Sequence, residues 1–276
     1  MNIDIQKAFT YIQKDVNWVK KWVIGSLLIF IPTILSSLSQ SVDKDNQKMV
    51  QDFLSSHPEI AVALIVAGLL SILLGIFVSG YTSKNVNTRI WDKDAALPEW
   101  KNWGSLFFTG FKLFCGMGIY IVFLAAIGIG LFLPIAGALH GTKWILVLVG
   151  LLYFVVCYLL LVFCLIIAHF AFLTDLKFVS FFNFKLIGKI VNKNLLNIIF
   201  YILLCLGLHI MSSMLAYTLM LTVIGVAAMP FVYFYVSLIS ADLAAQVIAN
   251  GVNPSVAENI TPAGNENVSG SQHNEK

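Results

Sequence analysis

The chain has 276 residues, of which 59% are hydrophobic and 11% are charged, and its mean hydropathy is +0.86. Soluble globular domains contain about 45–50% apolar and about 25% charged residues, so this composition excludes an ordinary soluble protein. The formal net charge is only +3, and the basic residues are confined to a few segments. The composition therefore indicates an integral membrane protein.

Residues 1–21 alternate apolar side chains with Lys and Asp at approximately helical spacing, and they precede the first long apolar segment. Residues 177–194 have the same character, with Phe, Leu and Ile between Lys and Asn. Amphipathic segments of this kind are typical of helices that lie on a membrane surface. We therefore predict a cytoplasmic amphipathic segment at 1–21 and a second interfacial helix at 177–194, although either could be an ordinary turn.

Six apolar segments have about the length that a helix needs to cross a bilayer, which is roughly 20 residues. They are 22–38, 60–80, 105–139, 144–173, 195–211 and 214–239. We predict an all-α fold: a polytopic transmembrane helical bundle of about six spans that occupies residues 22–249. The third segment is too long for a straight crossing, so it should tilt, kink at Gly116–Gly118 or begin as a surface helix.

The connections carry less information than the spans. Residues 39–59 are predicted to form a solvated connector with at most one helical turn, at 49–54. Spans five and six should be joined by a tight turn at Ser212 and Ser213. The tail 250–276 is rich in Asn, Ser and Gly and is predicted to be disordered and cytoplasmic.

The positions of the basic residues indicate the orientation. Three of the 17 Lys and Arg residues lie in the connections after spans one and three, namely Lys44, Lys48 and Lys143. The other 14 precede span one, lie around the connections after spans two and four, or end the chain. Because cytoplasmic loops carry an excess of Lys and Arg, both termini are predicted to be cytoplasmic, which agrees with an even number of spans.

The polar segment 81–103 contains four basic residues, three acidic residues and three Trp. Trp residues gather at membrane–water interfaces. Pro98 suits the first turn of a helix, and the negative charge of Glu99 suits the helix dipole. We therefore predict an interfacial helix at 98–112, with five candidate anchors: Trp91, Pro98, Glu99, Trp100 and Trp103.

Ionisable residues within or beside spans are the usual indicators of function in membrane proteins. His169 lies toward the inner end of span four, and Asp242 lies just past the inner end of span six, so the two are candidates for a polar pair. Such a pair could relay protons or simply hold two helices together. No carboxylate lies at the centre of a span, which argues against an ion-coupled transporter.

Signatures of enzymes and of metal sites are missing from the sequence, which has no P-loop, HExxH or GxSxG motif. The four Cys residues lie in apolar spans and are expected to be small buried hydrophobes. The basic loops are explained by the orientation and not by nucleic-acid binding. We therefore expect no enzymatic activity, no cofactor, no metal and no nucleic-acid partner.

A group of residues around the segment 81–103 resembles the domain of unknown function 4013 family. These residues are Gly80-Tyr81, Arg89, Leu97-Pro98-Glu99-Trp100, Trp103-Gly104, Leu106-Phe107 and Gly110. Looser similarity covers 8–11, 15–18, Phe231 and Ala241, and the chain departs from the family in carrying the connector 39–59. The resemblance implies a six-span inner-membrane protein of a prokaryote and supplies no catalytic residues.

Two functional classes remain. One is a non-enzymatic scaffold or envelope-associated factor, which acts in the lipid bilayer with membrane-protein partners or as a homo-oligomer. The other is a transporter or lipid-handling permease, which prolines within spans (Pro32, Pro134 and Pro230) could support by breaking helices, although they often serve packing alone. A polar surface that faces a cavity at mid-membrane would separate the classes, and the sequence pattern does not reveal one. A membrane enzyme is a distant third.

Overall fold

The structure is a computed structural model that describes residues 3–40, 44–138, 143–219 and 222–252. Within these ranges the chain is built from helices and contains no strand, so the predicted all-α class is confirmed. The predicted disordered tail lies outside the described residues from position 253 onward.

Eleven helical elements follow one another along the described chain. They are α1 Ile5–Thr10, the 3-10 helix η1 Ile12–Lys14, α2 Trp18–Leu28, α3 Phe30–Gln40, α4 Lys44–Ser56, α5 Pro58–Trp91, α6 Trp103–Ala138, α7 Lys143–Asp175, the 3-10 helix η2 Phe178–Phe182, α8 Phe184–Leu219 and α9 Val223–Gly251.

Five of the described helices are long and apolar enough to cross a membrane. The stretches are Pro58–Trp91 in α5, Trp103–Leu131 in α6, Val147–Asp175 in α7, Phe184–Leu219 in α8 and Gly225–Gly251 in α9. They correspond to the second to sixth predicted spans. The protein is therefore a polytopic helical membrane protein.

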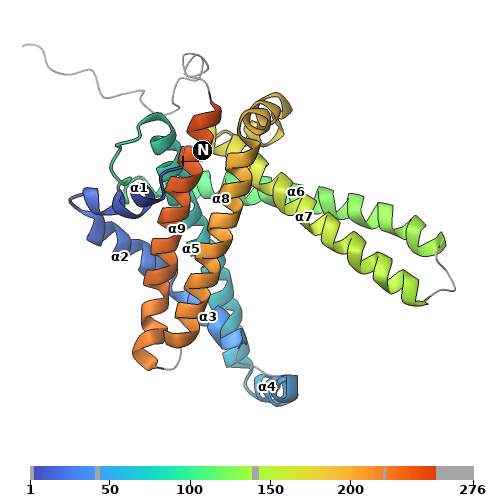
Figure 1. The fold of residues 1–276 in the computed structure, drawn as a ribbon. Helices are drawn as coiled ribbons and strands as arrows, with labels where there is room; N and C mark the ends of the chain where they lie inside the picture. The colour runs from blue at the N-terminus through green and yellow to red at the C-terminus, as the bar shows by residue number, and fades with distance from the viewer. Residues whose placement is uncertain (1–2, 41–43, 139–142, 220–221, 253–276) are drawn as a thin grey trace, which may run out of the picture.

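The first predicted span, 22–38, is divided between two shorter helices, α2 and α3, which meet at Ile29. Pro32 explains the break, because a proline has no N–H to donate to the carbonyl group four residues earlier. Together α2 and α3 lead from the end of the bundle that holds α1 to the opposite end, where α4 lies (Figure 1).

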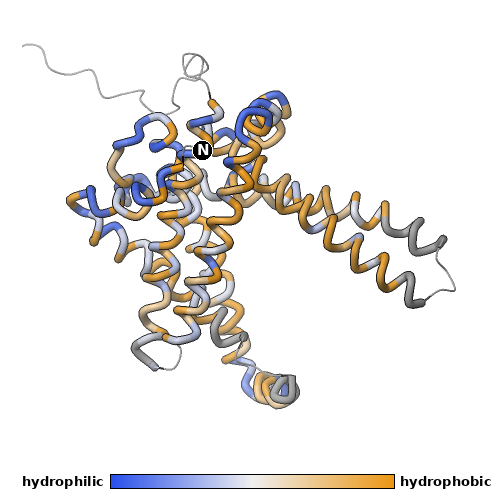
Figure 2. The backbone as a smooth tube through the Cα atoms, in the orientation of Figure 1, coloured by the Kyte–Doolittle hydropathy of each residue, from blue (hydrophilic) through white to orange (hydrophobic). Residues whose placement is uncertain are grey.

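The body of the bundle consists of α5, α8 and α9, which lie side by side, with α3 packed against α5 and α9 (Figure 1). The N-terminus and the described end of α9 lie at the same end of this body, which we call the N-terminal end. The helices α6 and α7 form a hairpin that leaves the body at a steep angle. Figure 2 shows hydrophilic residues gathered at the N-terminal end, whereas the hairpin is hydrophobic along most of its described length.

Several predicted boundaries were wrong because hydropathy marks the bilayer and not the helix end. The helix α5 continues 11 residues beyond Gly80, so the predicted polar segment 81–103 is half helix and the loop is 92–102. The helix α8 runs through Ser212 and Ser213 to Leu219, so no turn occurs there. The predicted connector 39–59 contains a 13-residue helix, α4.

The third span was expected to tilt, to kink at Gly116–Gly118 or to begin as a surface helix. The helix α6 is continuous through Gly116–Gly118, so it has neither a break there nor a separate surface helix. The predicted interfacial segment 177–194 consists of η2 and the first part of α8, which bends at Asn194. The side chain of Asn194 donates a hydrogen bond of 3.1 Å to the Val247 carbonyl on α9, which fixes the bend. Contact of this segment with the membrane surface stays a prediction.

The packed core lies in the half of the bundle near the N-terminal end. Its largest fully buried side chains include Tyr81, Phe170, Phe172, Phe181 and Phe234. By contrast, the outer part of the α6–α7 hairpin exposes large apolar residues such as Val122 and Phe154, as expected of surfaces that face lipid.

Candidate functional site

A buried lysine joins the N-terminal segment to the loop 92–102. The ammonium group of Lys21 lies 2.7 Å from Oδ2 of Asp15 and 2.8 Å from Oε1 of Glu99, and it donates a hydrogen bond of 2.6 Å to the Leu97 carbonyl. The side chains of Lys21 and Asp15 are each 5% exposed, whereas that of Glu99 is 51% exposed. A buried charge requires such partners, so Lys21 holds the loop against α2.

The pKa values of this cluster follow from its contacts. The hydrogen bond from Lys21 lowers the pKa of Glu99 below its ordinary value of 4.5. Burial works to lower the pKa of Lys21, but its hydrogen bonds to Asp15 and Glu99 outweigh that effect and raise the pKa above 10.5. Both shifts keep the ion pair charged around neutral pH.

Trp100 completes the attachment of the loop. Its ring stacks on Tyr81 of α5 with the centroids 3.9 Å apart, and its Nε1 donates a hydrogen bond of 2.9 Å to the Lys21 carbonyl. The Tyr81 hydroxyl donates a hydrogen bond of 3.0 Å to the Pro98 carbonyl. The Leu-Pro-Glu-Trp sequence is therefore a structural clamp between α2 and α5.

The predicted helix at 98–112 was wrong in its first turn. Residues 97–102 are not helical, and α6 begins at Trp103, after Asn102 with a φ of 55°. The carbonyl groups of Leu97 and Pro98 are engaged by Lys21 and Tyr81, which holds this stretch in an irregular conformation. Asn is among the few residues that tolerate a positive φ.

The five candidate anchors separate into two groups. Trp91 and Trp103 are 38% and 44% exposed and can reach lipid head groups, which stays a prediction. Trp100 is only 8% exposed and packs inside the protein, so the structure does not place it at an interface. Pro98 and Glu99 belong to the clamp described above.

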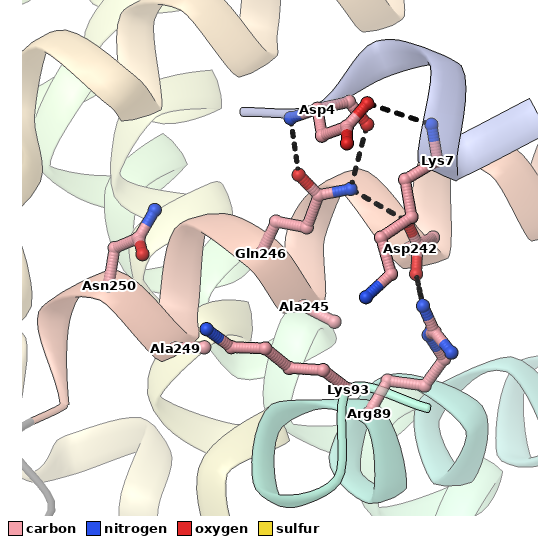
Figure 3. A pocket seen from close by; sticks show the side chains of 9 residues that line it. All are labelled: Asp4, Lys7, Arg89, Lys93, Asp242, Ala245, Gln246, Ala249 and Asn250. Atoms are coloured by element: carbon pink, nitrogen blue, oxygen red, sulfur yellow. Dashed lines mark hydrogen bonds and ion pairs between the residues drawn. The ribbon is translucent and has the colours of Figure 1, made fainter. Parts of the chain in front are cut away.

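The second charged contact is a buried ion pair between α5 and α9. Nε and Nη2 of Arg89 each lie 2.5 Å from Oδ1 of Asp242, and the two residues are 5% and 1% exposed. Oδ2 of Asp242 accepts a hydrogen bond of 2.8 Å from Gln246, whose amide group also pairs with the backbone of Asp4 (Figure 3). The ion pair therefore joins α5 to α9, and Gln246 extends the contact to the N-terminal segment.

The predicted pair of His169 and Asp242 is not formed: Asp242 is bonded to Arg89 and Gln246, and Nε2 of His169 has no hydrogen-bond partner among the described residues. Sequence reasoning missed Arg89 because it assigned this residue to a loop. Tyr81, Asn85 and Arg89 are four residues apart, which is the spacing of one helix face, and that spacing was the available signal.

Tyr11 lies beneath this ion pair. The guanidinium carbon of Arg89 lies 4.3 Å from the centre of the Tyr11 ring. The Tyr11 hydroxyl accepts a hydrogen bond from the Asn85 amide and donates one to the Leu238 carbonyl. Burial raises the pKa of Tyr11 well above its ordinary value of 10.0.

A small pocket of about 170 Å³ lies beside the ion pair of Arg89 and Asp242, and its lining includes Lys7 and Lys93 (Figure 3).

A larger cavity, of about 290 Å³, lies between α5, α7, α8 and α9, and we call it the polar cavity. Its lining includes hydroxyl, phenol and imidazole groups from all four helices: Thr82, Ser83, His169, Tyr201, His209, Ser212, Tyr233, Ser237 and Ser240. No Asp, Glu, Lys or Arg of the described residues belongs to the lining. Its volume is near the lower end of the range of about 300–1,000 Å³ that is usual for ligand sites.

Two buried polar atoms of the polar cavity stand out. Oγ of Ser83 and Nε2 of His169 have no hydrogen-bond partner in the part of the chain that the structure describes. Ser83 is only 2% exposed. A buried polar group without a partner costs about 1–3 kcal/mol, so these atoms are suited to bind a ligand that supplies the missing hydrogen bonds.

Metal binding has no support within the described residues, which contain no cluster of three or more His, Cys, Asp or Glu side chains. The four Cys thiols are free and partly buried. The candidate site is therefore the polar cavity.

Comparison with protein families agrees with the resemblance that the residues around the segment 81–103 indicate. A family model described as "Protein of unknown function (DUF4013)" matches residues 60–221, which is more than half of the chain. The chain belongs to the DUF4013 family. The part matched to DUF4013 contains most of α5, the clamp loop, α6, α7 and all of α8, and so three of the four walls of the polar cavity. Comparisons with curated proteins and with solved structures gave no match.

Proposed function

We propose that the protein is a transporter or permease that binds an uncharged, hydrogen-bonding molecule in the polar cavity. The observation that carries this proposal is the presence of two unpartnered buried polar atoms, Ser83 Oγ and His169 Nε2, in one cavity within the apolar bundle. A polar surface around such a cavity is the feature that distinguishes a permease from a scaffold, and it favours the permease.

The chemistry of the lining defines the ligand. A charged group buried in this cavity would face no residue of opposite charge among the described lining, and an unpaired buried charge is strongly unfavourable. Hydroxyl and imidazole groups instead match a neutral group that both donates and accepts hydrogen bonds. A hydroxylated neutral molecule fits these requirements.

We further propose a non-enzymatic role in a prokaryotic cell membrane. The excess of basic residues near the N-terminal end favours an orientation with both termini cytoplasmic. Exposed Trp91 and Trp103 then lie at the cytoplasmic interface. The exposed apolar hairpin of α6 and α7 is available for a membrane-protein partner or a second copy, besides lipid.

Purification in a mild detergent, followed by extraction and mass spectrometry of the bound molecules, tests this proposal. We expect one neutral, hydroxylated molecule in a stoichiometric amount. Recovery of a stoichiometric protein partner together with only bulk phospholipid would contradict the proposal and favour the scaffold.

A further inference from the structure

A second cavity adjoins the polar one. It has a volume of about 400 Å³ and lies in the groove between α5 and α6. Its lining is almost wholly apolar, with Ile72, Gly75 and Ile76 on α5 facing Leu113, Phe114 and Met117 on α6. These positions recur every three or four residues, so each helix contributes one continuous face.

His169 connects the two cavities because it belongs to the lining of both. The other residues that line the groove are mostly apolar, whereas those that line the polar cavity include many hydroxyl groups. Its unpartnered Nε2 is therefore at the boundary between an apolar and a polar compartment. No Asp, Glu, Lys or Arg of the described residues lines either compartment.

We propose that the ligand is a lipid with a neutral, hydroxylated head group. The head group lies in the polar cavity and its hydrocarbon chain lies in the α5–α6 groove, with His169 at the point where the two join. This inference rests on the proposed function and adds the chemical class of the ligand. It follows from the polarity of the two compartments, one of which is polar and the other apolar. A neutral water-soluble molecule has no apolar part that would fill the groove. A phospholipid carries charges that the lining does not pair.

The groove offers a position for a clean test. A side chain at Gly75 would project into it, because no atom lies within 4 Å of the position of an added Cβ. Gly75→Leu should therefore fill the groove without displacing the backbone. Gly68 lies two turns earlier on the same helix, has the same free space and does not line the groove, so Gly68→Leu is the matched control.

The experiment uses the full chain in phosphatidylcholine vesicles and two photoreactive forms of 1-oleoylglycerol. One carries a diazirine in the middle of the chain, and the other carries it on the glycerol. We expect the chain probe to label 72–79 on α5 and 110–117 on α6, and the glycerol probe to label residues around His169 and Ser240. An excess of unlabelled 1-oleoylglycerol should abolish both labels.

Gly75→Leu should reduce labelling by the chain probe about tenfold, because losing the burial of about two methylene groups is enough for that change, whereas Gly68→Leu should leave it unaltered. If Gly75→Leu does not fold, Gly75→Val replaces it in the test. The smaller Val side chain should then reduce labelling by the chain probe to a lesser extent. Equal labelling of the exposed hairpin and the groove, or equal effects of the two Leu variants, would overturn the inference.

The outcomes separate this inference from the proposed function. If the glycerol probe labels the polar cavity but the chain probe does not label the groove, the polar cavity binds a ligand and the lipid assignment is wrong. If neither probe gives a label that unlabelled 1-oleoylglycerol removes, the lipid assignment fails, and mass spectrometry of the purified protein then decides whether the proposed function fails with it.

Discussion

The backbones of Gly80 and Gly110 touch where α5 crosses α6. A Cβ added at Gly80 would overlap the carbonyl group of Leu106, and a Cβ added at Gly110 would overlap that of Ile76. Both obstacles are backbone atoms, which cannot rotate away as a side chain can. The two glycines therefore permit the close crossing that sets the direction of the α6–α7 hairpin and the shape of the groove.

Substitution of either glycine should destabilise the protein. Gly80→Ala and Gly110→Ala are each expected to lower the free energy of unfolding by about 1–3 kcal/mol, because the added methyl group overpacks the crossing. Gly118→Ala on α6 is the control, since no atom lies within 4 Å of its Cβ position. Thermal unfolding in mild detergent measures the difference, and equal stability of all three variants would show that the crossing is looser than described.

The ion pair of Arg89 and Asp242 should be more sensitive to the loss of one partner than to the replacement of both. Arg89→Ala leaves the buried Asp242 carboxylate unpaired and should cost about 3–5 kcal/mol. The double variant Arg89→Met and Asp242→Leu should recover much of that loss, because no charge is then buried. Thermal unfolding of the single and double variants in detergent checks this, and a double variant as unstable as Arg89→Ala would contradict it.

The contact between Lys21 and Glu99 predicts a dependence of stability on pH. The pKa of Glu99 is lower in the folded protein than the ordinary value of 4.5, so its contribution is present above that value and is lost as the pH falls through the lowered pKa. Glu99→Gln should therefore be less stable than the wild type at pH 7 but equally stable in strong acid. A constant difference in melting temperature from pH 7 down to pH 3 would argue against the ion pair.

The three Trp residues of the segment 81–103 should differ in fluorescence quenching. Trp91 and Trp103 are exposed, whereas Trp100 lies between Tyr81 and the Lys21 carbonyl. In variants that keep one of these three as the sole Trp of the chain, brominated lipids should quench Trp91 and Trp103 more strongly than Trp100. Equal quenching at all three positions would mean that the clamp does not form in the membrane.

The sequence allowed the class, the approximate positions of the spans and the family to be predicted, because long apolar segments and the residues around Leu97–Trp100 are local signals. Helix ends were predicted poorly for a physical reason. A membrane helix can continue into water, as α5 does from Gly80 to Trp91, and hydropathy falls where the bilayer ends and not where the helix ends.

The candidate site could be predicted only in part. His169 was recognised as an unusual residue, but its partner was assigned wrongly, because pairing depends on which helix faces are in contact and the sequence does not specify that. The polar cavity was missed because, apart from His169 and His209, its polar groups are scattered Ser, Thr and Tyr residues on three helices, α5, α8 and α9. None of these residues is unusual within its own helix, and they form a polar surface only after the helices pack.

Native mass spectrometry of the protein released from detergent tests the central claim most directly, since it counts the molecules bound to each chain. We predict one bound neutral molecule on the wild type. It should be lost in Ser240→Leu, which fills the polar cavity, and kept in Ser213→Leu, a substitution of an exposed Ser on α8 that does not line the cavity. A wild-type protein without a bound molecule, or a bound molecule that persists in Ser240→Leu, would contradict the assignment of the polar cavity as a ligand site.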